Sequence, residues 1–295
     1  MKSIKAVLFT LFPFACLLVL AISLWNFTDA YLEYKAAKED YDKVLSGTVN
    51  DTGKEKVVNI VQDAADIYKK NHPSEDISED GTSEELPETE TVTEITYPDL
   101  DIGFDDLKGM NSDFVGILHI PVLKLTYPVV HSHDNQEYLH QTFSKMENAS
   151  GCIFLDYAAS ADFSNKHSII FGHNMKNGTM FGSLKEFMYD ETLCDQDPYL
   201  YIYTEEFVKK YKIFAYRLVT VKDELYDLAD RVAFQDAEYE NLLNDILKFN
   251  YKHGECDINF SAHPDLITLS TCWGTDHTHF LVVHAALIGT VKTKE

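Results

Sequence analysis

The chain has 295 residues, 45% of them hydrophobic, which is enough for one sizeable domain with extensions. Its formal net charge of −23 excludes the clustered lysine and arginine surface that nucleic-acid binding requires, so no nucleic-acid partner is expected. Cysteines outside the N-terminal apolar run have no CxxC spacing, which argues against a zinc site. We therefore predict no metal and no cofactor. The five cysteines are Cys16, Cys152, Cys194, Cys256 and Cys272.

An uncharged apolar run occupies residues 6–25, close to the N-terminus. About 20 such residues are needed for a helix to cross the hydrocarbon layer of a membrane. Lys2 and Lys5 precede the run, so the positive-inside rule predicts residues 1–5 as a cytoplasmic tail. A cleaved signal peptide is the alternative, but its apolar core is usually shorter. We predict a single-pass anchor in the cell membrane, with the rest of the chain outside the cell.

Residues 26–96 are predicted to form a stalk between the anchor and the main domain. Apolar residues recur at three- and four-residue steps over residues 27–47 and again over 56–70, which predicts two helices. The stretch that follows is dominated by Glu, Ser, Thr, Asp and Pro. Because such a stretch cannot bury enough apolar surface to order itself, we predict that it is a solvated linker.

The texture becomes β-rich over residues 97–295, which we predict to be one catalytic domain. Eight short β-rich runs alternate with turns, which is typical of a closed or nearly closed β-barrel, so the predicted fold class is mainly all-β. One amphipathic helix of about 13 residues interrupts the strands at 236–253. Its predicted buried face comprises Tyr239, Leu242, Leu243, Ile246 and Leu247. The runs are FVGILHI, LTYPVVH, CIFLDY, HSIIFGH, YLYIYT, YKIFAYRLVTV, LITLST and FLVVHAALI.

Two residues at predicted strand ends are candidates for catalysis. Cys272 follows the run Ile267–Thr271, and His173 follows Ser168–Phe171 and Gly172. A strand end beside a loop is where a scaffold presents a side chain to substrate, and a thiol becomes a nucleophile only with a basic or positive neighbour. The alternatives are a buried structural cysteine and a structural histidine. Competing histidines are His131, His133, His277, His279 and His284.

At these residues the sequence resembles the sortases, which are membrane-anchored cysteine transpeptidases of Gram-positive bacteria. The motifs TLSTC and, about a hundred residues upstream, IIFGHN carry the resemblance. The stretches YPVVHSHDNQEYLHQTF, ASGCIFLDY and FGHNMKNGTMFGSL, together with the late helix, resemble class B in particular. The resemblance covers roughly residues 98–292 and implies an eight-stranded β-barrel with N-terminal helices.

The resemblance also implies a thiol mechanism like that of cysteine proteases. Cys272 would attack a carbonyl in the C-terminal sorting signal of an exported surface protein or pilin, forming a thioester. An amine from a cell-wall peptide or a pilin lysine would then resolve it. His173 would protonate the leaving amine and later accept a proton from the incoming one. With ordinary pKa values of about 8.5 for the thiol and 6.5 for the imidazole, only a minority of molecules would hold both charged forms.

This sequence departs from the family pattern at one position. The family places an arginine on the strand after the cysteine, but this chain has only Arg217 and Arg231, and neither is there. An ungapped alignment puts Phe280 in the arginine position, whereas a one-residue bulge would put His279 there as a stabiliser of the oxyanion. Two other readings are possible for the group that stabilises the oxyanion. Arg217 could reach the site from another strand, or backbone N–H groups could act alone.

Several residues near the two candidates, and the function of the chain as a whole, have more than one reading. Ser270 and Thr271 precede the nucleophile and are candidates for substrate contact, or simply strand residues. Asn174 is most simply a turn residue. Because of the missing arginine, a catalytically weak relative that binds sorting signals is the alternative function. A cysteine hydrolase, in which water resolves the thioester, and an anchored surface protein without activity are further readings.

Overall fold

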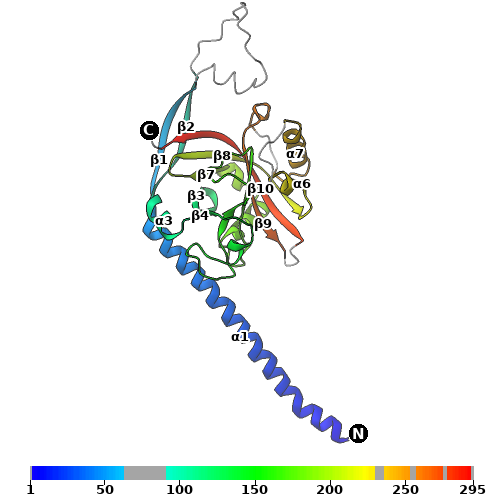
Figure 1. Cartoon of the computed structure of the whole chain (residues 1–295). Coiled ribbons are helices and arrows are strands. Elements are labelled where there is room, and N and C mark those ends of the chain that lie inside the picture. Colours follow the sequence, from blue (N-terminus) through cyan, green and yellow to red (C-terminus); the bar gives the residue numbers. More distant parts are fainter. Residues whose placement is uncertain (1, 63–90, 230–235, 253–256, 275–277, 294–295) are drawn as a thin grey trace, which may run out of the picture.

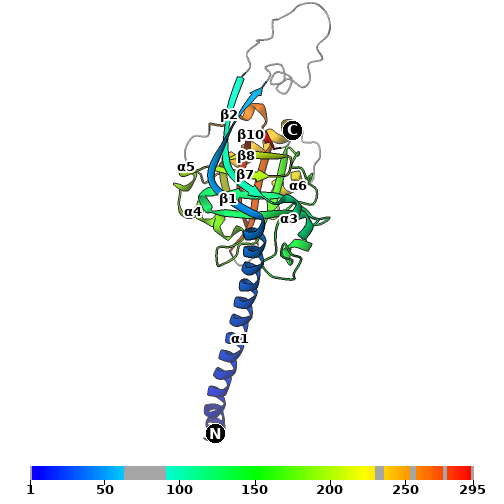
Figure 2. The ribbon, with the colours of Figure 1, turned by 90° about the vertical axis from the view of Figure 1, so that its left-hand side faces the viewer.

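The computed structural model describes residues 2–62, 91–229, 236–252, 257–274 and 278–293. Helix α1 (Lys2–Thr48) is a single unbroken helix that projects from a rounded body (Figures 1 and 2). The predicted anchor at 6–25 and the predicted helix at 27–47 are therefore parts of one element. By length and composition, this helix is apolar enough near its N-terminus to cross a membrane.

Two strands follow α1 where a second helix was predicted. Strand β1 (Val49–Gln62) pairs antiparallel with β2 (Thr91–Ile102) in a two-stranded ribbon beside the body (Figure 2). The predicted helix at 56–70 is thus wrong over 56–62, and its remainder lies outside the described residues, as does most of the predicted linker. The β-branched pairs Val57–Thr96 and Val58–Ile95 explain the strand, because cross-strand packing outweighs a helical periodicity this short.

The main body is a closed barrel of eight strands, as predicted, in the order β10-β8-β7-β3-β4-β5-β6-β9. Most neighbours are antiparallel, but β4–β5 and β6–β9 are parallel. The strands are β3 (Phe114–Ile120), β4 (Leu125–His131), β5 (Ile153–Leu155), β6 (His167–Phe171), β7 (Tyr199–Tyr203), β8 (Phe207–Thr220), β9 (Leu266–Trp273) and β10 (His279–Lys292).

Short helices connect the strands. The α-helices are α3 (Phe104–Met110), α4 (Glu186–Tyr189), α5 (Leu193–Gln196), α6 (Glu224–Ala229) and α7 (Asp236–Lys248); the 3₁₀ turns are Pro121–Leu123, Glu137–Leu139, Phe181–Lys185 and Phe260–Ala262. Helix α7 confirms the predicted late helix and ends at Lys248. Leu247, predicted on its buried face, is 43% exposed, because it lies about a quarter turn away from the stripe formed by the other four residues.

Side chains of the barrel strands alternate between two apolar cores. Ile267, Leu269, Leu281 and Val283 pack inside the barrel with the large cluster. Strand residues of the opposite parity, such as Leu266 and Val282, pack outside the barrel in a second cluster with Leu225 of α6 and Leu242 of α7. Since a strand alternates with period two, Thr268, Ser270 and Cys272 share the outer face with Leu266. The cysteine therefore lies on the outer face of the barrel.

Candidate active site

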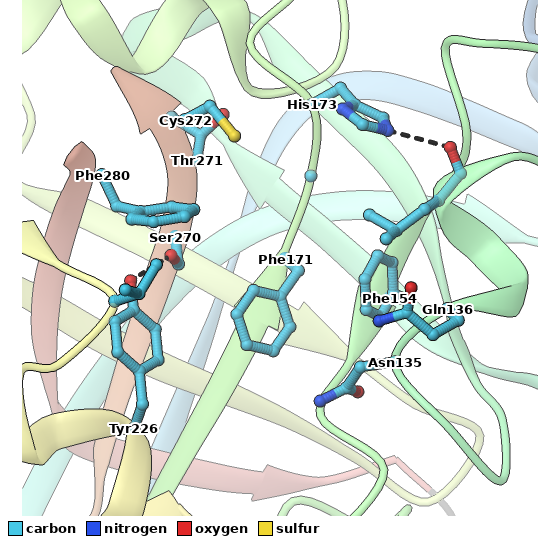
Figure 3. A pocket seen from close by; sticks show the side chains of 13 residues that line it. Asn135, Gln136, Phe154, Phe171, His173, Tyr226, Ser270, Thr271, Cys272 and Phe280 are labelled. Carbon is cyan, nitrogen blue, oxygen red and sulfur yellow. Dashed lines mark hydrogen bonds between the residues drawn. The ribbon is translucent and has the colours of Figure 1, made fainter. Parts of the chain in front are cut away.

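The parallel pairing of β6 and β9 brings the two predicted catalytic residues together. Phe171 pairs with Ser270, and the Gly172 amide donates a hydrogen bond of 3.2 Å to the Ser270 carbonyl. His173 comes two residues after Phe171, and Cys272 comes two residues after Ser270. Both line one pocket of about 540 Å³ on the outer face (Figure 3). The sulfur and the imidazole, about a hundred positions apart in the chain, thus both face one pocket.

The Cys272 side chain is half-buried near the end of β9. Burial raises the pKa of the thiol, and a hydrogen bond from its own backbone amide only partly offsets this. The resting group is therefore a neutral thiol at neutral pH and needs a base in order to attack. Its carbonyl accepts a hydrogen bond of 2.8 Å from the Asn174 side-chain amide. Asn174, expected to be only a turn residue, thus ties the histidine loop to the cysteine strand.

The His173 ring lies on the other side of the pocket, and Figure 3 shows the sulfur pointing toward that side. Its Nε2 lies 2.9 Å from the Leu139 carbonyl oxygen. Because a carbonyl only accepts, Nε2 must carry a proton, and the neutral ring then has its lone pair on Nδ1. The His173 carbonyl in turn accepts a hydrogen bond of 3.0 Å from the Phe181 amide. The ring is therefore held in the tautomer that can take a proton at Nδ1.

A row of aromatic rings forms the pocket wall beside the cysteine. Phe280 packs edge-on against Tyr226, Tyr226 stacks on Phe171, and Phe171 packs against Phe154, with ring centroids 5.4–6.3 Å apart. Asn135 and Gln136 supply amides at the far edge, and the Asn135 side chain is fixed by a 2.9 Å hydrogen bond to Asp156. The pocket is thus mainly apolar, with a polar edge, as ligand-binding pockets usually are.

Both residues predicted as substrate contacts line the pocket, but neither presents a freely exposed hydroxyl. The Ser270 hydroxyl is buried and lies 2.9 Å from the Tyr226 hydroxyl on α6. The Thr271 hydroxyl is buried and has no hydrogen-bond partner among the described residues. Ser270 therefore joins α6 to the cysteine strand.

The bulge expected before β10 is absent. Strands β9 and β10 pair without a register shift from His279 to Ala286, and Phe280 lies opposite Cys272. His279 lies opposite Trp273, is exposed, contacts the Thr278 hydroxyl and does not line the pocket. The reading in which a bulge shifts His279 is therefore contradicted, because the regular ladder places Phe280 and not His279 opposite Cys272.

Arg217 does not line the pocket either. It is buried on β8 opposite Val282, and its Nη2 donates a 3.0 Å hydrogen bond to the Asp223 carboxylate. No lysine or arginine is among the described residues that line the pocket. His173 is the only histidine among these lining residues, and His277 lies outside the described part of the chain. No three described His, Cys, Asp or Glu side chains are grouped as a metal site requires.

Several lining residues were not identified from the sequence. Phe154 and Phe171 belong to runs recognised only as strands, and Tyr226 comes from a six-residue helix without a periodic signal. Leu139, whose carbonyl holds the histidine, acts through its backbone and so leaves no trace in residue type. For Phe280 the ungapped alignment drew attention to a residue that does line the pocket.

Comparison with known proteins gives one consistent result. A family model described as the sortase domain matches residues 118–288, more than half of the chain. Sortase B of Listeria monocytogenes is 29% identical over 167 residues, which cover 57% of this chain and 65% of that protein, slightly under two thirds of its length. Sortase B of Staphylococcus aureus is 28% identical over 193 residues, covering 63% of this chain and 74% of that protein.

Solved structures agree with the sequence relatives. The X-ray structure of Clostridium perfringens sortase B superposes with a TM-score of 0.56 at 27% identity, covering 63% of this chain and 99% of that one. A complex of Staphylococcus aureus sortase B with a substrate superposes with a TM-score of 0.56 at 25% identity, covering 65% and 85%.

Proposed function

Because the chain belongs to the sortase family, with class B relatives, we propose that it is a cysteine transpeptidase that processes sorting signals of exported proteins. The single observation that carries this proposal is the placement of Cys272 and His173 in one pocket by the β6–β9 register. The acceptor is an amine of a cell-wall peptide or of a pilin. Residues 97–295 would form the catalytic domain, and the pocket offers a groove for an extended peptide.

The proposed chemistry begins with a proton transfer. The Cys272 thiol gives its proton to Nδ1 of His173 as the sulfur attacks the scissile carbonyl, which forms the S–C bond. The imidazolium then returns that proton to the leaving amine as the C–N bond breaks, leaving a thioester. An incoming amine attacks the thioester, the imidazole accepts a proton from it, and the thiol is regenerated by that proton.

The raised pKa of Cys272 favours proton transfer during attack over a preformed thiolate. Such an enzyme is slow in free solution, but it tolerates this when substrate and enzyme share a membrane, because tethering raises the effective concentration. The apolar N-terminal part of α1 is compatible with this arrangement. We propose that residues 6–25 span the membrane with the N-terminus in the cytoplasm, so that the barrel meets exported substrates outside.

The alternative, a catalytically weak protein that binds sorting signals, is favoured by one observation. Phe280 occupies the place opposite Cys272, and no lysine or arginine lines the described pocket. Losing one oxyanion donor typically costs about 10²- to 10³-fold in rate. Under this alternative, Phe280→Arg raises the cleavage rate at least tenfold, because a guanidinium would stabilise both thiolate and oxyanion. Under the leading proposal Phe280→Arg lowers the rate by disrupting the aromatic wall, whereas His279→Ala changes it less than twofold.

The proposal is tested with the full chain in detergent micelles. A pooled set of fluorogenic sorting-signal peptides, with and without a glycine or lysine amine donor, reports cleavage and transfer. We expect Cys272→Ala to abolish both, whereas Cys194→Ala, which removes a buried thiol outside the pocket, leaves both unchanged. Trapping the acyl-enzyme and locating the modified residue by mass spectrometry should identify Cys272. Cleavage without any transfer to amine would instead assign a hydrolase.

A further inference from the structure

The C-terminal half of α1 docks against the barrel by one face. Its buried residues are Ala37, Asp40, Tyr41, Val44 and Thr48, which follow one another at three- or four-residue steps apart from the adjacent pair Asp40 and Tyr41. This spacing places them on one stripe of the helix. The preceding apolar residues, from Phe14 to Phe27, are exposed instead. One unbroken helix therefore carries both the proposed membrane anchor and a face that packs on the catalytic domain.

The docked face contacts the segment that holds the catalytic ring. The Tyr41 hydroxyl donates a 3.0 Å hydrogen bond to the Gly151 carbonyl, 110 residues away in sequence. About two helical turns earlier in α1, the Glu33 carbonyl accepts a 3.0 Å hydrogen bond from the Asn148 side chain. Both contacts clamp the segment 139–151, whose first residue supplies the carbonyl bound by His173.

Gly151 itself lies against the His173 ring. A Cβ added at Gly151 would come within 3.1 Å of Cδ2 of that ring and within 2.8 Å of the Leu139 carbonyl oxygen. The residue after Gly151 closes the segment, since the Cys152 amide donates a 2.8 Å hydrogen bond to the Tyr138 carbonyl. Tyr41 is thus separated from the catalytic imidazole by a single residue that packs tightly on both sides.

A second route runs from Tyr41 to the cysteine. The Tyr41 ring packs edge-on against Tyr127, with centroids 5.3 Å apart, and the Tyr127 hydroxyl accepts a 2.9 Å hydrogen bond from the Met180 amide. Met180 forms a β-bridge with Asn174, whose side chain holds the Cys272 carbonyl at 2.8 Å. The same tyrosine therefore supports the loops that fix both reacting groups.

We propose that α1 is part of the active-site framework as well as an anchor, and that Tyr41 is the positioning residue through which it acts on His173. This inference rests on the proposed function of the His173 and Cys272 pair. Proton transfer needs donor and acceptor within hydrogen-bond reach, and a displacement of about 1 Å can cost 10²-fold in rate. Any change that undocks α1 therefore lowers acid–base efficiency while leaving the barrel folded.

The test compares Tyr41→Phe and Tyr41→Ala in the full chain, in detergent micelles, with Tyr31→Phe as the matched control. Tyr31 lies on the same helix and is 57% exposed. We expect Tyr41→Phe to lower kcat for peptide cleavage about 3- to 10-fold and Tyr41→Ala more, with KM unchanged, because the groove itself is not altered. Tyr31→Phe should behave as the unmodified chain.

A second readout does not depend on turnover. Nitrogen-15 NMR of the histidine rings reports the tautomer of His173, which the Leu139 carbonyl holds with the proton on Nε2. We expect a single tautomer in the unmodified chain and a mixture of tautomers in Tyr41→Ala. The same tautomer and the same kcat in all three variants would overturn the inference. If the unmodified chain cleaves no peptide, the proposed function fails, while the NMR comparison still decides whether α1 positions the ring.

Discussion

The two sides of the pocket that holds Cys272 and His173 are built in different ways. The sulfur side consists of β9 and β10, joined by an unbroken ladder, with Phe280 and Tyr226 packed over it. The imidazole side consists of connecting segments, and the ring itself is held by the Leu139 carbonyl. Strand pairing fixes a residue through many cooperative bonds, whereas a loop residue depends on a few. The histidine is therefore the half of the site whose geometry is most easily lost.

Removing the imidazole should give the largest difference between the two sides, because it should affect cleavage but not the position of the sulfur. We expect His173→Gln to lower peptide cleavage by about 10²- to 10⁴-fold, because general acid–base catalysis contributes that much. Alkylation of Cys272 by iodoacetamide should continue at a similar rate per thiolate, since the sulfur side does not depend on the ring for its position. His133→Gln, at a ring that is 84% exposed, is the control and should change neither rate.

Loss of alkylation together with cleavage would contradict this separation. It would mean that the cysteine strand moves when the ring is removed, through the Asn174 side chain that joins them. Measuring both rates on the same preparation distinguishes a chemical role of His173 from a structural one.

Acid should weaken the packing of β6 against β9, the two strands on which both sides of the pocket rest. Thr268, on the same face of β9 as Cys272, bridges His167 and His284, with contacts of 2.8 and 2.9 Å. Burial lowers the pKa of His167 to about 4 and that of His284 well below its ordinary range. Both rings are therefore neutral at neutral pH. Both are also buried in the folded chain.

The sign of the pH effect follows from these shifts. In the unfolded chain a histidine binds a proton near pH 6.5, whereas folded His167 does so only near pH 4. Stability is therefore full above about pH 6.5 and falls as pH drops toward 4, by at most about 3 kcal/mol for His167 alone. Urea unfolding between pH 4 and 8 should show this loss, and His167→Gln should flatten it. An equal slope in His167→Gln would show that other groups dominate.

The barrel, and the presence of Cys272 and His173 in one pocket, could be predicted from the sequence because both leave periodic or motif signals. Each barrel strand is a run of β-branched and aromatic residues between turns, and TLSTC and IIFGHN end at the pocket. The strand β1 of the two-stranded ribbon could not be predicted from the sequence, since the apolar residues over 56–62 fit a helix as well as a strand. Only its pairing with β2, about thirty residues later in the chain, decides between them.

The supporting contacts of the site escape sequence reasoning for a different reason. The carbonyls of Leu139, Gly151 and Cys272 hold or receive the key side chains, and a carbonyl is present in every residue. Which carbonyl meets which side chain depends on loop conformation, not on residue type. The sequence left open whether Phe280 or His279 follows the cysteine strand at the pocket, and only the β9–β10 register places Phe280 opposite Cys272.

The smallest predicted effect tests how tightly the imidazole side is packed. Gly151 has φ +59°, and an added Cβ would lie 2.6 Å from the Tyr138 carbonyl oxygen and 3.1 Å from the His173 ring. Gly178 also has a positive φ, +80°, but a Cβ there would meet nothing within 4 Å. Replacing either residue by alanine costs about 1–2 kcal/mol of backbone strain. In Gly151→Ala alone, the ring or the Leu139 segment must also move.

We therefore expect Gly151→Ala to lower kcat about tenfold and Gly178→Ala to leave kcat within twofold, although both lower the free energy of unfolding measured in urea. The contrast isolates the contact with the ring, because the backbone strain is common to both variants. If both variants kept the original kcat, the imidazole side would be able to relax around a methyl group without losing its geometry. The two sides of the pocket would then be equally robust, and the dependence of His173 on its loop contacts would have to be abandoned.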